Sequence, residues 1–121
     1  MSFPNVVELS LFTCDLHSVD LDLSRVFPNI RRLAVTFTKF EDRMSVDKSF
    51  SKLTHLQIHA DPNAQVGEFE RFTEDEVLRI LKKNPDIHSL SLVYATPELL
   101  RTIDETFPNV VNLGMISLSA A

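Results

Sequence analysis

Glycine and cysteine are scarce in this chain of 121 residues. It contains two glycines, Gly67 and Gly114, and one cysteine, Cys14. Two isolated glycines cannot build a Walker loop or a dinucleotide-binding turn, because each of these motifs needs several glycines close together. A single cysteine excludes an internal disulfide framework and indicates the reducing interior of a cell, either cytoplasmic or nuclear.

Basic residues and long apolar runs are also limited. The chain has 12 basic and 17 acidic residues, for a formal net charge of -5. Such a composition offers no basic face to a phosphate backbone and would be repelled by an anionic membrane surface. No apolar run is long enough to cross a bilayer, and no charged-then-apolar leader is present. We therefore expect neither nucleic acid nor a membrane as a partner.

What the sequence does contain is a phrase that recurs five times. The first copy reads FPNVVELSL and the last reads FPNVVNLGM. The copies begin at Phe3, Phe27, Phe50, Asn84 and Phe107. Their starts are about 24, 23, 34 and 23 residues apart, which suits a repeat of about 20 to 29 residues with one insertion. We interpret residues 1–121 as a single repeat domain.

Each copy contains two apolar residues separated by one residue. These pairs are Leu9 and Leu11, Leu33 and Val35, Leu56 and Ile58, Leu90 and Leu92, and Leu113 and Met115. Alternate side chains of a strand share one face, so each pair is expected to form one rung of a common core. No rung is stable alone, but stacking would let each buried aliphatic side chain contribute about 1.5 to 3 kcal/mol.

Two segments between the copies carry helix-start signals. Thr73 precedes the acidic run 74–76, which predicts a capped helix with negative charge at its positive end. Its apolar stripe is Val77, Leu78, Ile80 and Leu81, followed by Lys82 and Lys83. Thr96 and Pro97 predict a second helix with Leu99, Leu100 and Ile103 facing inward. The stretch 60–71 is predicted to be an inserted loop.

The letters FPN have a structural explanation. Proline cannot continue a helix, so Pro4, Pro28, Pro85 and Pro108 are expected to end one segment and turn the chain into the next strand. The phenylalanines before these turns are expected to stack on one another. The asparagines Asn5, Asn29 and Asn109 suit the turn that follows. The phrase is therefore predicted to be structural.

The phrase F-P-N-[VI]-x-x-L-x-[LVM], in units of 23 or 24 residues with helices ending just before it, resembles the leucine-rich repeat region of F-box/LRR proteins from Phe3 to Leu118. The resemblance implies an α/β leucine-rich repeat solenoid, with about five parallel strands on the concave side and helices and turns on the convex side. In that family the repeats capture a substrate for ubiquitination, and a separate F-box binds a Skp1-type adaptor. No F-box is visible and polar end caps are missing, so we expect a fragment of a longer receptor.

Side chains that alternate with the core leucines are expected to face a protein partner, because solenoids bind partners on that surface. The expected partner-binding residues on this face are Phe12, Arg32, His55, Gln57, His59, Val93 and Ile116, and Phe37 and Tyr94, one residue further on, are expected at its rim. The leading function is thus a non-enzymatic interaction module. The alternatives are a generic intracellular leucine-rich repeat scaffold and a small hydrolase or metal-dependent enzyme, and self-association through uncapped end strands is a third structural possibility.

The chain offers little for catalysis or metal binding. His55 and His59 lie about 13 Å apart on a strand, too far to share one metal ion. His17 and His88 have no partner that the spacing suggests. Cys14 is predicted to be a small buried residue, and the neighbouring Asp15, His17 and Ser18 lack triad geometry. The acidic cluster 68–76 lacks the spacing of a calcium loop. We assign no catalytic residue, metal or cofactor.

Overall fold

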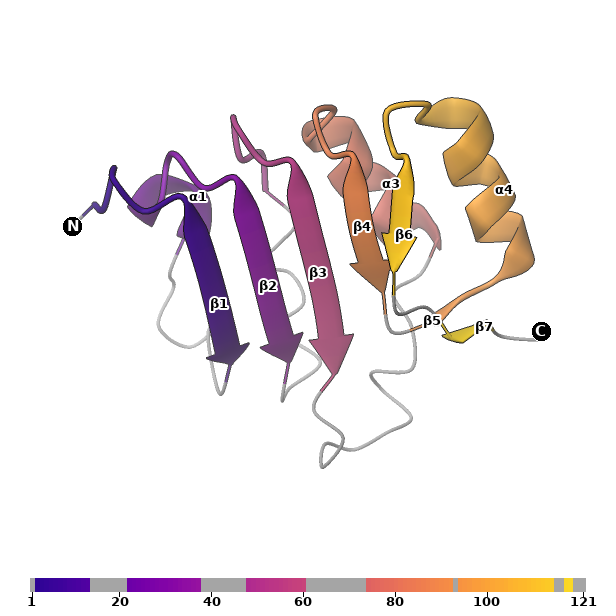
Figure 1. Ribbon diagram of the computed structural model, residues 1–121, viewed down its shortest axis with the longest axis horizontal. Helices are drawn as coiled ribbons and strands as arrows, with labels where there is room; N and C mark the ends of the chain where they lie inside the picture. The colour runs from indigo at the N-terminus through magenta and orange to yellow at the C-terminus, as the bar shows by residue number, and fades with distance from the viewer. Residues whose placement is uncertain are drawn as a thin grey trace.

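The structure is a computed structural model that describes residues 2–13, 22–37, 48–60, 74–92, 94–114 and 117–118. Strands and helices alternate along these residues (Figure 1). In chain order they are β1 Glu8–Thr13, α1 Leu23–Val26, β2 Arg32–Phe37, β3 His55–Ala60, α3 Glu74–Lys83, β4 Ser89–Leu92, β5 Tyr94–Ala95, α4 Pro97–Thr106, β6 Asn112–Gly114 and β7 Ser117–Leu118.

A five-stranded parallel sheet with the order β1-β2-β3-β4-β6 organises the fold. The copies of the phrase align in one register: Leu9 pairs with Leu33, Leu33 with Leu56, Leu56 with Leu90 and Leu90 with Leu113. Beyond this sheet, β5 and β7 form a separate parallel pair. The predicted α/β class and the five parallel strands are thus confirmed.

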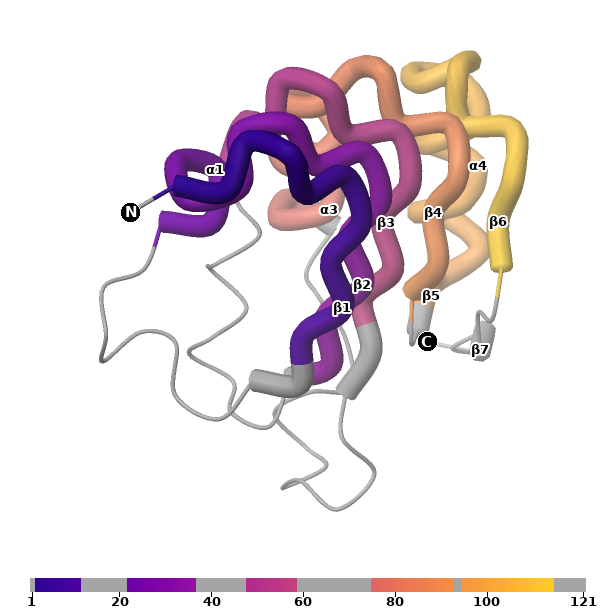
Figure 2. The backbone as a smooth tube through the Cα atoms, turned by 60° about the vertical axis from the view of Figure 1, so that its left-hand side comes forward, coloured from indigo at the N-terminus to yellow at the C-terminus, as the bar shows by residue number. Residues whose placement is uncertain are grey.

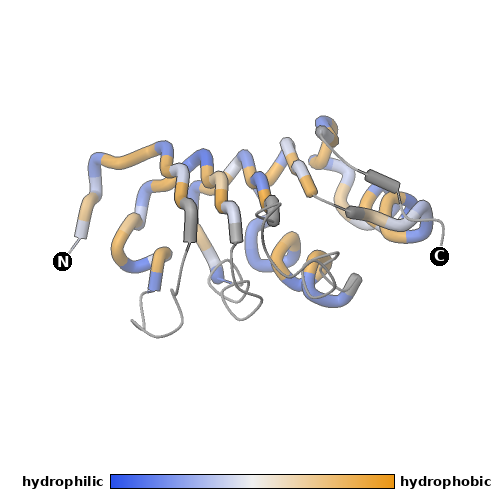
Figure 3. The backbone as a smooth tube through the Cα atoms, turned by 90° about the horizontal axis from the view of Figure 1, so that it is seen from below, coloured by the Kyte–Doolittle hydropathy of each residue, from blue (hydrophilic) through white to orange (hydrophobic). Residues whose placement is uncertain are grey.

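The helices lie on one side of this sheet, as the views in Figures 2 and 3 show. Strand residues such as Leu33 and Ile58 and helix residues such as Ile80 and Ile103 belong to one buried cluster, each at most 3% exposed. The apolar alternation of the strands therefore places its leucines against the helices, as expected for a sheet with one covered face.

The helix signals in the sequence correspond to real helices. Leu99 N–H donates to the Oγ1 of Thr96 at 3.1 Å, and Pro97 occupies the first turn of α4. Within α3, Val77, Ile80 and Leu81 are buried, and Lys82 and Lys83 lie exposed in the last turn. Both predicted apolar stripes are confirmed, whereas the predicted cap Thr73 lies outside the described residues.

The phrase FPN links neighbouring strands. The Nδ2 of Asn29 donates to the carbonyl of Pro4 at 2.7 Å, and that of Asn109 donates to the carbonyl of Pro85 at 3.4 Å. The Phe3 and Phe27 rings stack with their centroids 5.5 Å apart. The asparagines therefore do more than suit the local turn, because they join consecutive copies of the phrase.

The prediction that every inner leucine lies in the core is wrong at β6. Leu113 is 46% exposed, although its register partner Leu90 is only 3% exposed. The reason is that β6 forms one edge of the five-stranded sheet, so only one side of it has a neighbour. The predicted loop 60–71 begins one residue too early, because Ala60 is the last residue of β3. The rest of that loop, Cys14 and Met115 lie outside the described residues.

Candidate functional site

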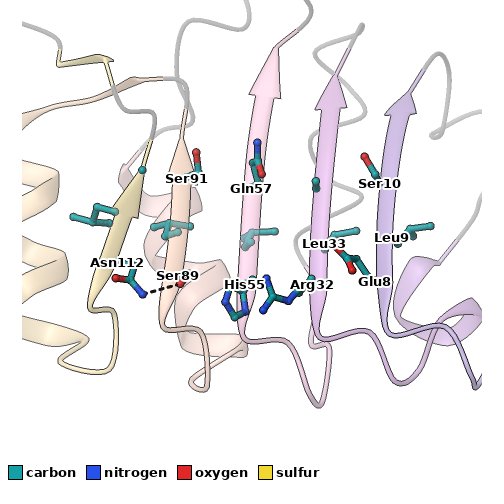
Figure 4. A pocket seen from close by; sticks show the side chains of 15 residues that line it. Glu8, Leu9, Ser10, Arg32, Leu33, His55, Gln57, Ser89, Ser91 and Asn112 are labelled. Carbon is teal, nitrogen blue, oxygen red and sulfur yellow. Dashed lines mark hydrogen bonds between the residues drawn. The ribbon is translucent and has the colours of Figure 1, made fainter.

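Two rows of side chains cross the uncovered face of the sheet (Figure 4). The register aligns the first row, which is Glu8, Arg32, His55, Ser89 and Asn112. It aligns the second row two residues further on, which is Ser10, Ala34, Gln57, Ser91 and Gly114. Because strand side chains alternate between faces, both rows lie opposite the helix layer.

The two rows line a hollow of about 410 Å³ that reaches from β1 to β6. We call this hollow the sheet groove. Its second row holds small side chains at Ser10, Ala34 and Ser91, and none at Gly114. A Cβ atom added to Gly114 would meet nothing within 4 Å, so the groove is open at β6. Gln57 is the one long side chain of this row, so a ligand can approach the backbones of the other four strands.

Charge is concentrated near one end of the sheet groove. Glu8 on β1 and Arg32 on β2 are register neighbours, and the guanidinium of Arg32 points towards His55 on β3 (Figure 4). Burial lowers the pKa of His55, and the positive charge of Arg32 and the proximity of His88 lower it further, against an opposing effect of Glu8. His55 is therefore held neutral at neutral pH, where its imidazole can both donate and accept hydrogen bonds.

A second histidine joins this site from the next strand connection. The rings of His55 and His88 meet edge to face with their centroids 4.6 Å apart. The Nδ1 of His55 lies 2.8 Å from the Oγ1 of Thr54, and the Nδ1 of His88 lies 3.4 Å from the Oγ of Ser89. Asn112 in turn donates to that Ser89 hydroxyl at 3.1 Å. These contacts fix both rings beside the groove.

The spacing along the chain suggests no partner for His88, and the structure places its ring against that of His55. His88 comes one residue before the first-row position of its strand, and His55 occupies the first-row position of the neighbouring strand. In parallel strands with a shared register these two positions are adjacent. Aligning the fourth copy of the phrase under the third would have indicated the pair, whereas spacing along one strand could not.

We expect the pH dependence of stability to reflect the lowered pKa of His55. The unfolded chain takes up this proton first, at the ordinary histidine pKa of about 6.5. The free energy of unfolding should therefore be unaffected above that pH and should fall as the pH drops through the lower folded pKa. An NMR titration of the His55 ring measures this pKa directly.

Two substitutions test which charges cause the lowered pKa of His55. Arg32→Gln should raise the His55 pKa, because it removes a positive neighbour, and Glu8→Gln should lower it, because it removes a negative one. A His55 pKa at or above 6.5 in the unmodified chain would contradict the arrangement of these charges.

The expected partner-binding residues divide into two groups. Arg32, His55 and Gln57 line the sheet groove. Four others, Phe12, Phe37, His59 and Tyr94, occupy positions in β1, β2, β3 and β5, and their side chains are outside the described part of the structure. Val93 and Ile116 lie outside the described residues altogether. Ser89 and Asn112 also alternate with the core leucines, as expected for this face, but the hydrogen bond between them was not predicted.

The described residues carry no arrangement for a metal ion or a membrane span. Within them, no group of three or more His, Cys, Asp or Glu side chains is arranged to hold a metal ion. The His55 and His88 pair lacks a third ligand in that part of the chain. In the same residues, none of the helices has the length and apolar character needed to span a bilayer.

Comparisons with protein-family models, with curated proteins and with solved structures found no match to this chain. Inference about function therefore depends on the geometry of the sheet groove and of the sheet itself.

Proposed function

We propose that this chain is a protein-interaction module of the leucine-rich repeat class, in which the sheet groove binds a segment of a protein partner. Support comes from five parallel strands in one register, each of which begins within a copy of the same phrase. In such a solenoid the helices would form the convex side and the groove would lie on the concave side. The observation that carries the proposal is the open groove across all five strands, whose lining combines apolar surface with polar side chains.

The dimensions of the sheet groove suit an extended peptide segment. Parallel strands lie about 4.8 Å apart, so a path across five strands is about 19 Å long. An extended segment advances about 3.3 Å per residue, and about six residues would therefore cross the groove. Ala34 and Ser91 leave room for the side chains of the partner, while Arg32 and Gln57 supply hydrogen-bond donors.

The repeat phrase also supports a more specific proposal. By its resemblance to F-box/LRR proteins, we propose that the module recognises a substrate for an intracellular ubiquitin ligase. A generic leucine-rich repeat scaffold would use the same groove without a Skp1-type adaptor. Purification of the protein from its own cells would distinguish the two proposals. A stoichiometric Skp1-type adaptor in the purified complex supports a ubiquitin-ligase receptor, and a complex without the adaptor supports the generic scaffold.

A groove variant tests the module itself. Ala34→Arg with Gln57→Arg places two long cationic side chains in the sheet groove, and we expect at least a tenfold loss of partner captured from lysate. The matched control is Asp104→Asn with Glu105→Gln, which changes the net charge by the same amount on exposed residues of α4. Both variants should retain the circular dichroism of the unmodified chain. Equal capture by the two variants would refute binding in the groove.

A further inference from the structure

Exposed large hydrophobic side chains gather at the two open edges of the sheet. Among the described residues they are Phe3 and Val7, at 44% and 49% exposure, and Val111 and Leu113, at 71% and 46%. Phe3 and Val7 lie in the first copy of the phrase, just before β1, and Val111 and Leu113 lie in the last copy, just before and within β6. The strands β1 and β6 are the ends of the strand order, so among the described residues neither has a second neighbouring strand.

The inner copies of the phrase have polar residues at the position where the first and last copies have Val7 and Val111. Val7 and Val111 occupy the fifth position of the first and last copies, where the inner copies have Arg31, Thr54 and His88. Arg31 is exposed and the other two are half-buried, so polar side chains are used where this position faces water inside the sheet. Valine at both edges instead provides an apolar surface, which favours contact with another protein surface.

The backbone at this position follows one hydrogen-bond rule. The carbonyl of Val7 accepts from the N–H groups of Arg31 and Arg32 at 2.8 and 3.1 Å. The carbonyl groups of Arg31, Thr54 and His88 each accept in the same way from two N–H groups of the following copy. By this rule the Val111 carbonyl offers an acceptor at one edge, and the N–H groups of Val7 and Glu8 offer donors at the other.

A second pattern concerns the side chains of the FPN turn. Asn29 and Asn109, at the third position of their copies, donate to the carbonyl of the proline one copy earlier, namely Pro4 and Pro85. In the third copy Ser51, at the second position, donates to the Pro28 carbonyl instead. At the two edges the corresponding groups are the Asn5 amide, which is a donor, and the Pro108 carbonyl, which is an acceptor. The two edges are therefore complementary in hydrogen bonding as well as in apolar surface.

We propose that the β6 edge of one molecule binds the β1 edge of a second copy of this chain, continuing the parallel sheet in the same register. Val111 would then lie beside Val7 of the second copy, and Phe107 beside its Phe3, as Phe27 lies beside Phe3 within one chain. Because the two edges differ, the contact is heterologous, and repetition gives open linear oligomers. The contact uses the sheet edges and is independent of the partner bound in the groove.

Two edge variants test this arrangement by sedimentation equilibrium. The unmodified chain should show a mass that rises with concentration through multiples of the monomer. Val7→Glu blocks the β1 edge and Val111→Glu blocks the β6 edge, and each variant alone should be monomeric, with association at least tenfold weaker. An equimolar mixture should form a one-to-one dimer and nothing larger, because one intact edge of each kind remains. The double variant Val7→Glu with Val111→Glu serves as the fully blocked control.

Three results would overturn the proposal. The first is an unmodified chain that stays monomeric at the highest concentration, which would mean that the edges receive something other than a second copy. The second is self-association of either variant alone. The third is an equimolar mixture that stays monomeric. A measurement without substitutions accompanies these. Hydrogen exchange at the N–H groups of Val7 and Glu8 should slow by at least tenfold as the protein concentration rises, and concentration-independent exchange would equally refute the contact.

Discussion

Asn84→Ala should lower the free energy of unfolding by about 2 to 3 kcal/mol, because it leaves a buried backbone donor without an acceptor. Asn84 is only 2% exposed. Its Oδ1 accepts from the Phe50 N–H at 2.7 Å, and its Nδ2 donates to the carbonyl groups of Lys48 and Ile80 at 2.8 and 2.9 Å. One side chain thus joins the C-terminal end of α3 to the turn before β3.

The same position makes a less expected prediction. The other four copies of the phrase begin with phenylalanine, so Asn84→Phe would restore the repeat pattern. A hollow of about 150 Å³ lies between Asn84 and Phe107 and could take part of the ring. The Phe50 N–H would nevertheless lose its acceptor. We therefore expect Asn84→Phe to destabilise the fold despite its better match to the phrase.

Urea denaturation followed by circular dichroism measures both effects. Asn109→Ala is the matched control, because Asn109 is exposed and makes a single long hydrogen bond of 3.4 Å. Its change in unfolding free energy should stay within about 0.5 kcal/mol. Equal values for Asn84→Ala and Asn109→Ala would show that the buried amide does not stabilise this junction.

The sheet could be predicted from the sequence because all five copies of the phrase have the same spacing of apolar residues, which defines the register of the strands. The pairs that begin with Leu33, Leu56 and Leu90 fix which residues face the helices, and a shift by one residue would expose all of them. The helix cap at Thr96 could also be predicted from adjacent residues, because threonine followed by proline is a sufficient helix-start signal. Both features depend on neighbours along the chain.

The parts that sequence reasoning missed depend on neighbours in the adjacent copy. The edge-to-face contact of His55 and His88 joins residues 33 positions apart, and Asn84 bonds to a backbone 34 positions away. The exposure of Leu113 follows from the end of the sheet and not from its own phrase, which matches that of Leu9. A repeat pattern describes what the copies share, whereas these features arise where one copy departs from the others.

Leu56→Ala and Leu113→Ala compare the same substitution at the same position of the phrase. Leu56 lies on the central strand β3 and is 3% exposed, so its truncation should lower the free energy of unfolding by about 2 to 5 kcal/mol. Leu113 is 46% exposed on β6, so its truncation should cost the monomer below about 1 kcal/mol, because water already reaches much of the side chain.

The comparison also distinguishes the sheet within one molecule from contact between molecules. At low concentration, denaturation of Leu113→Ala reports the monomer and should show the small cost. At high concentration the same variant should lose stability relative to the unmodified chain, since a second copy at the β6 edge would bury Leu113 in that chain. If the loss of unfolding free energy for Leu113→Ala does not depend on concentration, the Leu113 side chain stabilises only the fold of one molecule. If that loss equals the loss for Leu56→Ala, β6 is not an edge strand.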